Sequence, residues 1–410
     1  MANKTVKYIK HLVQNLLWRI YHIWTSMLMK RIRKKDKIRF LFILQELSQW
    51  KTEMLYKAML MHPRFEPIIG VVPCLGFPGA ENKLIEYLKE KNYEFIYLDT
   101  ETTLSSQIDI DMVLHPRPYP SEIYKAHSIT RNLSIPIVSI PYFMNTITEN
   151  WVVNQRVNIL AWRQFLDNED VRKEWEKIHR LHGINLAVTG LPIMDENLVP
   201  KNNLEDVWPV KDNRKRIIYA PHHTIGTIHV SGIAYSTFLE YCDFMLELKS
   251  KYKEQVYFIF KPHPYLFHNL CLVWGEEKAK EYYNKWQEPG YSHIEVNTKY
   301  IALFKHSDAM IHDCGSFTIE YMYSGNPVMY LIRGEDHESN MNSCGKKAYQ
   351  LHYKGRTQSD IESFVNDVIE GRDELKPARE TFIKESLLPP NGKSACENII
   401  QAILGEGSYK

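Results

Sequence analysis

The sequence has few cysteines, and they do not follow a metal-binding or disulfide pattern. Six cysteines are scattered along 410 residues, and no Cys-x-x-Cys pair occurs among them. Structural zinc sites and small disulfide-rich domains need cysteines paired at short spacing. The sequence therefore predicts neither a metal centre nor a disulfide framework, as expected for a protein of a reducing cytoplasm. We also expect no cofactor.

The N-terminal region lacks acidic residues and lacks an unbroken apolar run. Residues 1–37 hold ten Lys or Arg and a single acid, Asp36. Residues 4–35 place apolar side chains at helical spacing, but Asn15, His22 and other polar residues interrupt them. A spanning helix needs about 20 mostly apolar residues. The pattern favours an amphipathic helix lying on an anionic membrane surface. The alternative is a helix packed on its own protein or on a second subunit.

A secretion signal is also not predicted, because no apolar core is followed by a small-residue cleavage site. Outside the N-terminal region, positive charge is not in excess: residues 38–410 carry 41 Lys or Arg against 48 Asp or Glu. This balance argues against a general nucleic-acid-binding protein, whose folded body would present a basic surface. The length and the 44% apolar content fit two globular domains.

Short apolar runs alternate with helical patterns through both halves of the chain, which indicates two Rossmann-like parallel sheets. In the first half we predict strands at 38–44, 67–72, 94–98, 112–115, 135–140 and 186–189, and helices at 49–61, 82–91, 121–131, 154–167 and 171–181. In the second half we predict strands at 216–220, 256–260, 293–296, 309–311 and 327–332, and helices at 237–251, 266–286, 317–323, 359–370 and 393–404.

The fold class predicted from this alternation is α/β of GT-B type, with two Rossmann-like parallel-sheet domains and a cleft between them. The expected segments are the basic membrane-association helix 1–37, the first domain 38–196, a polar linker 197–215, the second domain 216–385 and a C-terminal helix 386–410.

Three polar loops of the second half follow predicted strands, so they should share the carboxyl edge of one sheet. The first loop holds His222 and His223, the second holds Lys261 and His263, and the third runs over residues 313–318 at the start of a helix. Imidazoles, an ammonium group and a helix N-terminus together suit a diphosphate. A transfer reaction would use one imidazole, His222 or His223, as the base. Each loop alone also has a structural reading as a rigid turn or a hydrogen-bonded strand end.

The motifs of this half resemble the CDP-glycerol glycerophosphotransferase family, which builds teichoic acids and related capsule polymers. The similar segments are Gly190-Leu191-Pro192-Ile193-Met194-Asp195, Tyr219-Ala220-Pro221, Lys261-Pro262-His263-Pro264, Asp313-Cys314-Gly315-Ser316, Glu320-Tyr321, Pro327-Val328-Met329-Tyr330 and Asn391-Gly392-Lys393-Ser394-Ala395. The resemblance is carried by their order and spacing from about residue 186 onward.

The resemblance implies a CDP-activated polyol donor, a lipid-linked glycan acceptor and a peripheral position on the cytoplasmic face of the cell membrane. It implies that the second domain binds the nucleotide donor and the first the acceptor. The expected donor-binding residues are Lys261, Asp313, Gly315, Ser316, Phe317, Thr318 and Glu320, with His222, His223 and His263 as catalytic residues. The expected acceptor or cleft residues are Glu46, Tyr142 and Asn145.

Tyr142 stands where the family has a histidine proposed as the base, and a tyrosine has a reference pKa of about 10. We therefore expect the base at His222 or His223. The predicted reaction transfers glycerol- or ribitol-phosphate from the CDP-activated donor to a glycan hydroxyl and releases CMP. The alternatives are a sugar transferase that uses a UDP- or CMP-sugar on the same fold, and a degenerate member that acts as a membrane-bound scaffold. A homo-oligomer stays open.

Overall fold

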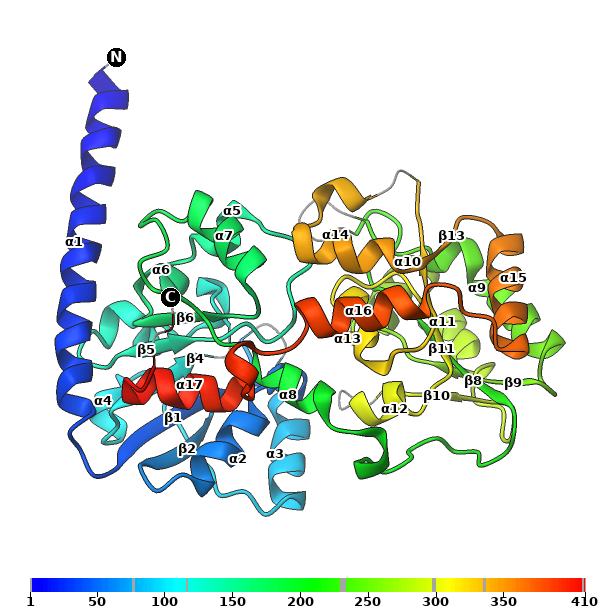
Figure 1. The fold of residues 1–410 in the computed structure, drawn as a ribbon, viewed down its shortest axis with the longest axis horizontal. Helices are drawn as coiled ribbons and strands as arrows, with labels where there is room; N and C mark the ends of the chain where they lie inside the picture. Colours follow the sequence, from blue (N-terminus) through cyan, green and yellow to red (C-terminus); the bar gives the residue numbers. More distant parts are fainter. Residues whose placement is uncertain are drawn as a thin grey trace. The chain divides into compact units, whose positions relative to one another are not determined.

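The computed structural model divides into two compact units, each described by itself (Figure 1). Unit 1 comprises Met1–Met144, Thr148–Glu196 and Leu387–Lys410, and unit 2 comprises Asn145–Ile147 and Asn197–Ser386. The structure describes residues 2–75, 78–115, 117–228, 234–296, 300–334, 337–407 and 409. The C-terminal segment thus returns to unit 1.

Unit 1 is built on a seven-stranded sheet in the order β3-β2-β1-β4-β5-β6-β7, and every neighbouring pair is parallel. The strands are β1 (Ile38–Leu44), β2 (Phe65–Val71), β3 (Ile96–Tyr97), β4 (Met112–His115), β5 (Ile137–Ser139), β6 (Arg163–Leu166) and β7 (Leu186–Val188). The central strand β1 is an almost unbroken apolar run because both faces of a parallel sheet are covered.

The helices of unit 1 connect these strands. They are α1 (Ala2–Ile32), α2 (Glu53–Met61), α3 (Glu81–Glu90), α4 (Leu104–Gln107), α5 (Asn150–Val153), α6 (Arg156–Leu160), α7 (Glu169–Ile178), α8 (Pro192–Leu198) and α17 (Ala395–Leu404). Asp195 fixes the start of α17, because its carboxylate accepts hydrogen bonds from the backbone N–H groups of Ala395 (2.7 Å) and Cys396 (2.8 Å). Two of the N–H groups that a helix start leaves without an intrahelical acceptor are thereby satisfied.

Helix α1 contacts the rest of unit 1 through both polar and apolar residues. The His22 Nε2 lies 2.7 Å from the carbonyl oxygen of Ile159, and Arg180 donates hydrogen bonds to Gln14 (3.1 Å) and Asn15 (3.0 Å). Three of the polar residues that interrupt the apolar pattern, Gln14, Asn15 and His22, therefore face the protein, as do Trp18 and Tyr21. Apolar side chains on the same helix are exposed: Val6, Ile9, Leu12, Val13, Leu16, Leu17, Ile20, Ile23, Trp24 and Met27.

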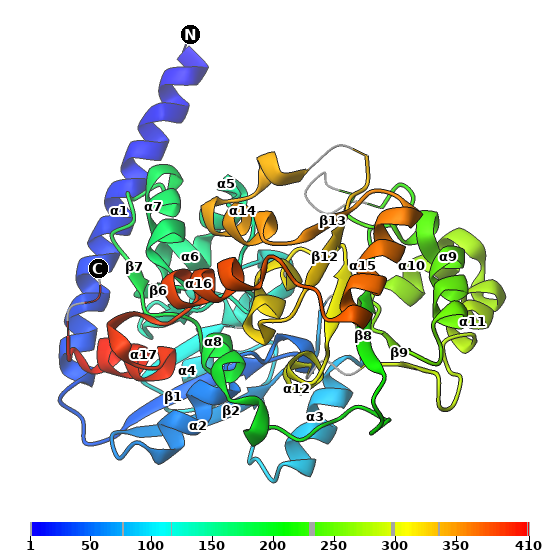
Figure 2. The same ribbon diagram turned by 45° about the vertical axis from the view of Figure 1, so that its right-hand side comes forward.

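The N-terminal part of α1 extends beyond the sheet and helices of unit 1 in both ribbon views (Figures 1 and 2). Over the described residues, no helix combines the length and the apolar character that crossing a bilayer requires.

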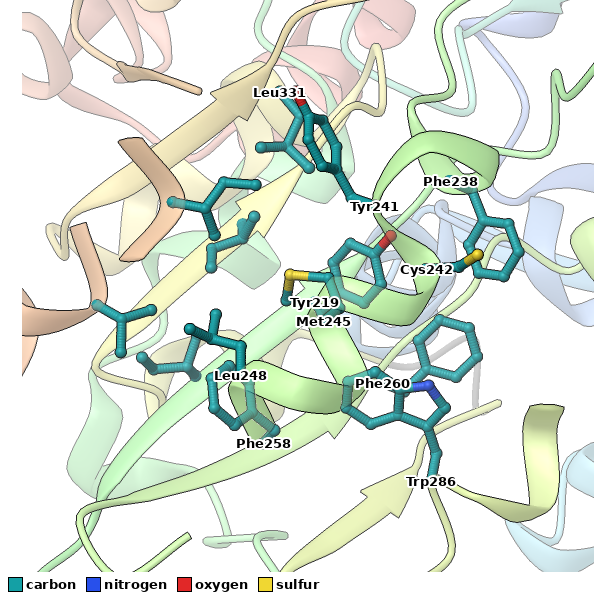
Figure 3. Close-up of a cluster of buried hydrophobic side chains, with 14 of the residues drawn as sticks. Tyr219, Phe238, Tyr241, Cys242, Met245, Leu248, Phe258, Phe260, Trp286 and Leu331 are labelled. Atoms are coloured by element: carbon teal, nitrogen blue, oxygen red, sulfur yellow. The ribbon is translucent and has the colours of Figure 1, made fainter. Parts of the chain in front are cut away.

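Unit 2 contains a six-stranded sheet in the order β10-β9-β8-β11-β12-β13, again with every neighbouring pair parallel. The strands are β8 (Lys215–Ala220), β9 (Val256–Phe260), β10 (Ser292–Ile294), β11 (Ala309–His312), β12 (Val328–Leu331) and β13 (Tyr353–Gly355). Aromatic side chains fill one face of this sheet (Figure 3). Phe260 stacks on Trp286 with ring centroids 5.0 Å apart, and Tyr219 lies 5.7 Å from Phe260. The two sheets confirm the predicted fold class.

The helices of unit 2 are α9 (Phe238–Lys251), α10 (Leu266–Trp274), α11 (Glu276–Asn284), α12 (Ile301–Lys305), α13 (Phe317–Glu320), α14 (Ser343–Gln350), α15 (Gln358–Glu370) and α16 (Lys376–Ser386). The short segment Asn145–Ile147 packs on α14. Asn342 connects the two, since its side-chain amide donates to the Asn145 carbonyl (2.8 Å) and its backbone N–H donates to the Thr146 carbonyl (2.8 Å).

Four predicted helices differ from the observed ones. The predicted helix 154–167 is α6 followed by strand β6, and the prediction was wrong because a short, partly apolar run does not distinguish a buried strand from a helix. The predicted helix 266–286 is divided into α10 and α11 at Gly275, whose φ of 86° is incompatible with a continuing helix.

Residues 121–131 form 3₁₀ turns instead of a helix, and residues 317–323 form the four-residue α13 followed by a 3₁₀ turn over Tyr321–Ser324. The second difference matters for the site, because four residues carry only a small part of the helix dipole that the sequence analysis assumed.

Candidate functional site

Three histidines come together at the carboxyl edge of the sheet in unit 2. His222 and His223 follow β8, and His263 follows the neighbouring strand β9. The ring centroids of His222 and His223 lie 4.4 Å apart, those of His222 and His263 lie 5.1 Å apart, and those of His223 and His263 lie 4.3 Å apart. One ring nitrogen from each residue lies within 4.8 Å of those from the other two, and all three side chains are partly exposed. We call these residues the imidazole cluster.

Asp313, which follows the adjacent strand β11, holds the loops around the imidazole cluster in place. Its carboxylate accepts hydrogen bonds from the backbone N–H of His222 (2.5 Å) and from the backbone N–H (2.6 Å) and hydroxyl (2.9 Å) of Thr237. Asp313 is fully buried, and burial raises its pKa to about 6 although these donors oppose the shift. Asp313 is a predicted donor-binding residue, but in the structure its carboxylate is buried and positions the loops through its hydrogen bonds.

The ring nitrogens of the imidazole cluster have defined protonation patterns. The His263 Nδ1 accepts a hydrogen bond from the backbone N–H of Tyr265 (3.2 Å), so the proton of the neutral ring is on Nε2. The His223 Nδ1 lies 3.2 Å from the side-chain nitrogen of Asn269. This nitrogen also donates to the His223 carbonyl oxygen (2.8 Å), which fixes the orientation of the amide.

His222 likewise has a hydrogen-bond donor beside its Nδ1. Its Nδ1 lies 2.9 Å from the Thr224 hydroxyl, which accepts hydrogen bonds from the backbone N–H groups of Tyr235 (2.9 Å) and Ser236 (3.3 Å). The Thr224 hydrogen is therefore directed to the His222 Nδ1, and the His222 Nε2 carries the ring proton. All three rings are Nε2–H tautomers, and each offers an N–H donor.

Burial keeps the rings of the imidazole cluster neutral. It lowers the pKa of His223 to about 4 and lowers the pKa values of His222 and His263 well below the usual imidazole range. A neutral imidazole that binds a metal through Nε2 must carry its proton on Nδ1, where these rings meet donors. It also cannot accept a proton at an Nε2 that already carries one. The donor set thus fits an oxyanion better than a metal ion or a general base.

Lys261 and Glu320 both contact Tyr300. The Lys261 Nζ lies 5.2 Å from the centre of the Tyr300 ring, and the Tyr300 hydroxyl donates a hydrogen bond to the Glu320 carboxylate. Lys261 is 6% exposed and Glu320 is 1% exposed. Glu320 is another predicted donor-binding residue, but in the structure its carboxylate is buried and accepts the hydrogen bond of Tyr300.

The loop after β11 combines buried and accessible residues. Gly315, Ser316 and Phe317 are partly exposed, whereas Thr318 is buried and donates its hydroxyl hydrogen to the Cys314 carbonyl (3.2 Å). The Cys314 thiol contacts the Ala220 carbonyl (3.2 Å), so this loop lies directly beside the one that carries His222. Among the residues of this loop that are expected to bind the donor, Gly315, Ser316 and Phe317 are therefore the ones that a ligand can reach.

The residues expected at the acceptor are divided between the two units. Asn145 lies in unit 2, is 7% exposed and is held under α14 by Asn342. Glu46 and Tyr142 lie in unit 1, where both contact Arg117, a residue that the sequence analysis missed. Arg117 donates to Glu46 (2.8 Å), and its guanidinium carbon lies 5.2 Å from the centre of the Tyr142 ring. Arg117 could have been found by the rule used for the histidines, because it follows strand β4.

The two parallel α/β sheets define a fold of GT-B type, and solved structures confirm it. A UDP complex of S. aureus MnaA is 15% identical with a TM-score of 0.58, and 90% of this chain and 98% of that chain are covered. UDP-GlcNAc 2-epimerase from Neisseria meningitidis, bound to UDP-GlcNAc, is 16% identical with a TM-score of 0.57, covering 90% and 100%. A variant of the wall teichoic acid polymerase TagF is 14% identical with a TM-score of 0.59, covering 99% and 98%.

The sequence match is more specific than the fold. Residues 154–342 match the sequence model of the CDP-Glycerol:Poly(glycerophosphate) glycerophosphotransferase family. This segment contains the imidazole cluster, Lys261 and the loop after β11. The predicted family resemblance is confirmed over these residues, and the match indicates an enzyme of the glycerophosphotransferase type. A comparison with curated protein sequences found no match.

Proposed function

We propose that this enzyme transfers glycerol- or ribitol-phosphate from a CDP-activated donor to a hydroxyl of a lipid-linked surface glycan and releases CMP. The family match supports the donor class. The same fold is seen in the wall teichoic acid polymerase TagF, including a variant soaked with CDPG. Cell-surface polymer synthesis is therefore the proposed setting.

The observation that carries this proposal is the set of three Nε2–H donors within the family-matched segment. In the reaction, an acceptor hydroxyl attacks the β-phosphorus of the donor, the bond to the oxygen of CMP breaks, and the hydroxyl proton passes to the phosphate of the departing CMP or to solvent. The imidazole cluster would donate hydrogen bonds to the phosphate oxygens as charge builds up on them. Lys261 would offset the charge of the departing CMP. The hydrogen bonds at the Nδ1 atoms support this donor role in place of the base role expected for His222 or His223.

The proposal is tested by incubating the purified chain with CDP-glycerol or CDP-ribitol and a membrane extract, and measuring CMP. We expect CMP from at least one donor and a large loss of rate in His263→Ala. The matched control is His293→Ala, since His293 is an exposed histidine on β10 away from the imidazole cluster. CMP from neither donor, together with stabilisation against thermal unfolding by UDP-sugars alone, would favour a sugar transferase instead.

We also propose that α1 holds the enzyme on an anionic membrane surface. Gln14, Asn15 and His22 face unit 1, while ten apolar side chains are exposed and Lys30 and Arg31 lie in the last turn of the helix. Such a row suits the boundary between headgroups and acyl chains. Replacing Leu16 and Ile20 by Glu should abolish cosedimentation with vesicles that contain anionic lipid. Met61→Glu, on the exposed end of α2, should leave cosedimentation unchanged; equal binding of all three proteins would refute the proposal.

A further inference from the structure

Unit 1 carries a second group of polar and aromatic side chains that the donor chemistry does not use. Glu46 follows β1 and Arg117 follows β4, and these strands are neighbours at the point where the strand order of the sheet reverses. Open α/β sheets bind ligands in the crevice beyond the carboxyl ends of the strands at such a point. We call the group the Arg117 cluster; its members are Glu46, Arg117, Tyr119, Glu122, Tyr142 and Trp151. Tyr119 connects its two parts, because it stacks on Trp151 and interacts electrostatically with Glu122 and Arg117.

The one positive charge of the Arg117 cluster, that of Arg117, is neutralised by ion pairs inside the protein. The two terminal nitrogens of Arg117 donate to Glu46 (2.8 Å) and to Glu122 (2.6 Å). One guanidinium thus faces two carboxylates, which leaves a surplus of negative charge. A phosphate group would be repelled here. The carboxylate oxygens, fixed by Arg117, remain suited to accept hydrogen bonds from hydroxyl groups.

The aromatic members add an apolar platform. Trp151 stacks on Tyr119 with ring centroids 5.6 Å apart and an angle of 29° between the ring planes. Trp151 is nevertheless 50% exposed, an unusual state for so large an apolar side chain. Since the stacking fixes the ring before any ligand arrives, a ligand that packs on its free surface loses little entropy in ordering it.

We infer that the Arg117 cluster binds a neutral sugar ring of the acceptor glycan. A pyranose presents an apolar C–H face, which can pack on the Trp151 ring, and a rim of hydroxyl groups, which can donate to Glu122. The Glu122 side chain is 24% exposed, whereas Glu46 is buried and holds Arg117 in place. This inference rests on the proposed function, because it names the part of the acceptor that unit 1 recognises. It assigns the specificity to an uncharged sugar and excludes the polyol-phosphate chain from this position.

The direct test uses the full chain and N,N′-diacetylchitobiose, a neutral N-acetylated disaccharide, observed by saturation-transfer NMR. We expect transfer to the sugar ring protons with the unaltered protein, a loss of affinity of at least about tenfold with Trp151→Ala, and a change of less than about threefold with Trp151→Phe, which keeps a platform. Glu122→Gln should also weaken binding. Tyr97→Ala is the control, since Tyr97 is a 68% exposed aromatic residue on the edge strand β3.

Two results would overturn the inference. One is the absence of saturation transfer from the unaltered protein at millimolar disaccharide, and the other is equal affinity in Trp151→Ala and the unaltered protein. Displacement of the disaccharide by a poly(glycerol phosphate) oligomer at equal concentration would also contradict it, because a charged chain would then occupy the position. CDP binding, measured by calorimetry on the same variants, tests the proposed function separately and should be unchanged by the Trp151 and Glu122 substitutions.

Discussion

The donor role of the imidazole cluster predicts a specific pattern of rescue at His263. His263→Ala removes the Nε2–H group, whereas His263→Gln replaces it with an amide N–H at a similar reach along the side chain. Because the His263 Nδ1 already accepts from the Tyr265 backbone, the ring has one hydrogen to offer and no free site for a proton. Glutamine can take over a donor role, but it cannot take over the role of a base.

The size of the effect follows from the kind of hydrogen bond. A bond to a charged phosphate oxygen contributes about 1.5–3 kcal/mol. At about 1.4 kcal/mol for each factor of ten, His263→Ala should lower kcat/KM for the CDP-activated donor by about 10- to 150-fold. His263→Gln should restore kcat/KM to within about tenfold of the unaltered enzyme.

The pH dependence separates the two roles independently. A base must be deprotonated to act, so the rate falls as the pH falls through its pKa. Burial holds the pKa of His263 well below the usual imidazole range, and His222, His223 and Lys261 lower it further. The rate should therefore show no imidazole step between about pH 6 and 8, where an imidazole of ordinary pKa, about 6.5, would produce one.

The assay is the initial rate of CMP release at several donor concentrations, with the thermal midpoint of each variant measured in parallel. The donor role would be refuted if His263→Gln were as inactive as His263→Ala and the unaltered enzyme lost activity through a single step near pH 6.5. His293→Ala should be indistinguishable from the unaltered enzyme in both measurements.

Three further predictions concern stability. Asp195→Ala should lower the free energy of unfolding by about 1–2 kcal/mol in urea, because the N–H groups of Ala395 and Cys396 at the start of α17 lose their acceptor; no loss would show that this contact is dispensable beside the N-cap Ser394. Burial lowers the pKa of His312 to about 3, so between pH 7 and 5 only the unfolded state gains a proton at this residue. This proton should lower the free energy of unfolding of the unaltered protein by about 2 kcal/mol over that range, and His312→Asn should lack this part of the fall; an equal fall in both proteins would contradict the assignment. In Gly345→Ala the new Cβ would lie 2.6 Å from the Thr146 carbonyl oxygen, so the thermal midpoint should drop; a rise would mean that the segment yields without cost.

Sequence patterns predicted the elements best where burial alone decides the residue types. The predicted bounds of β1, β4 and β9 agree with the structure, since a strand covered on both faces reads as a continuous apolar run. Strand β6 (Arg163–Leu166) was missed, because only its place between β5 and β7 makes it a strand. The apolar pattern also did not show that the predicted helix 266–286 is interrupted at Gly275.

The site was predictable to the level of its loops. Polar residues after strands β8 and β9 were expected to meet at one sheet edge, and the structure brings His222, His223 and His263 together there. The protonation pattern could not be predicted, because it depends on partners such as Asn269, which is 46 residues from His223 in the chain. The burial of Asp313 and Glu320 likewise depends on packing across the unit.

The way α1 meets unit 1 decides where this chain can be shortened. Near its end the helix contributes Thr25, Met29 and Ile32 to the interior, and Arg33 donates a hydrogen bond to the Ile403 carbonyl (2.8 Å). A version that begins at strand β1 would lose these contacts and expose part of the core of unit 1. A version that begins near residue 12 would instead lose some of the exposed apolar side chains, which favour aggregation in aqueous buffer, and would keep the turns of α1 that cover the core.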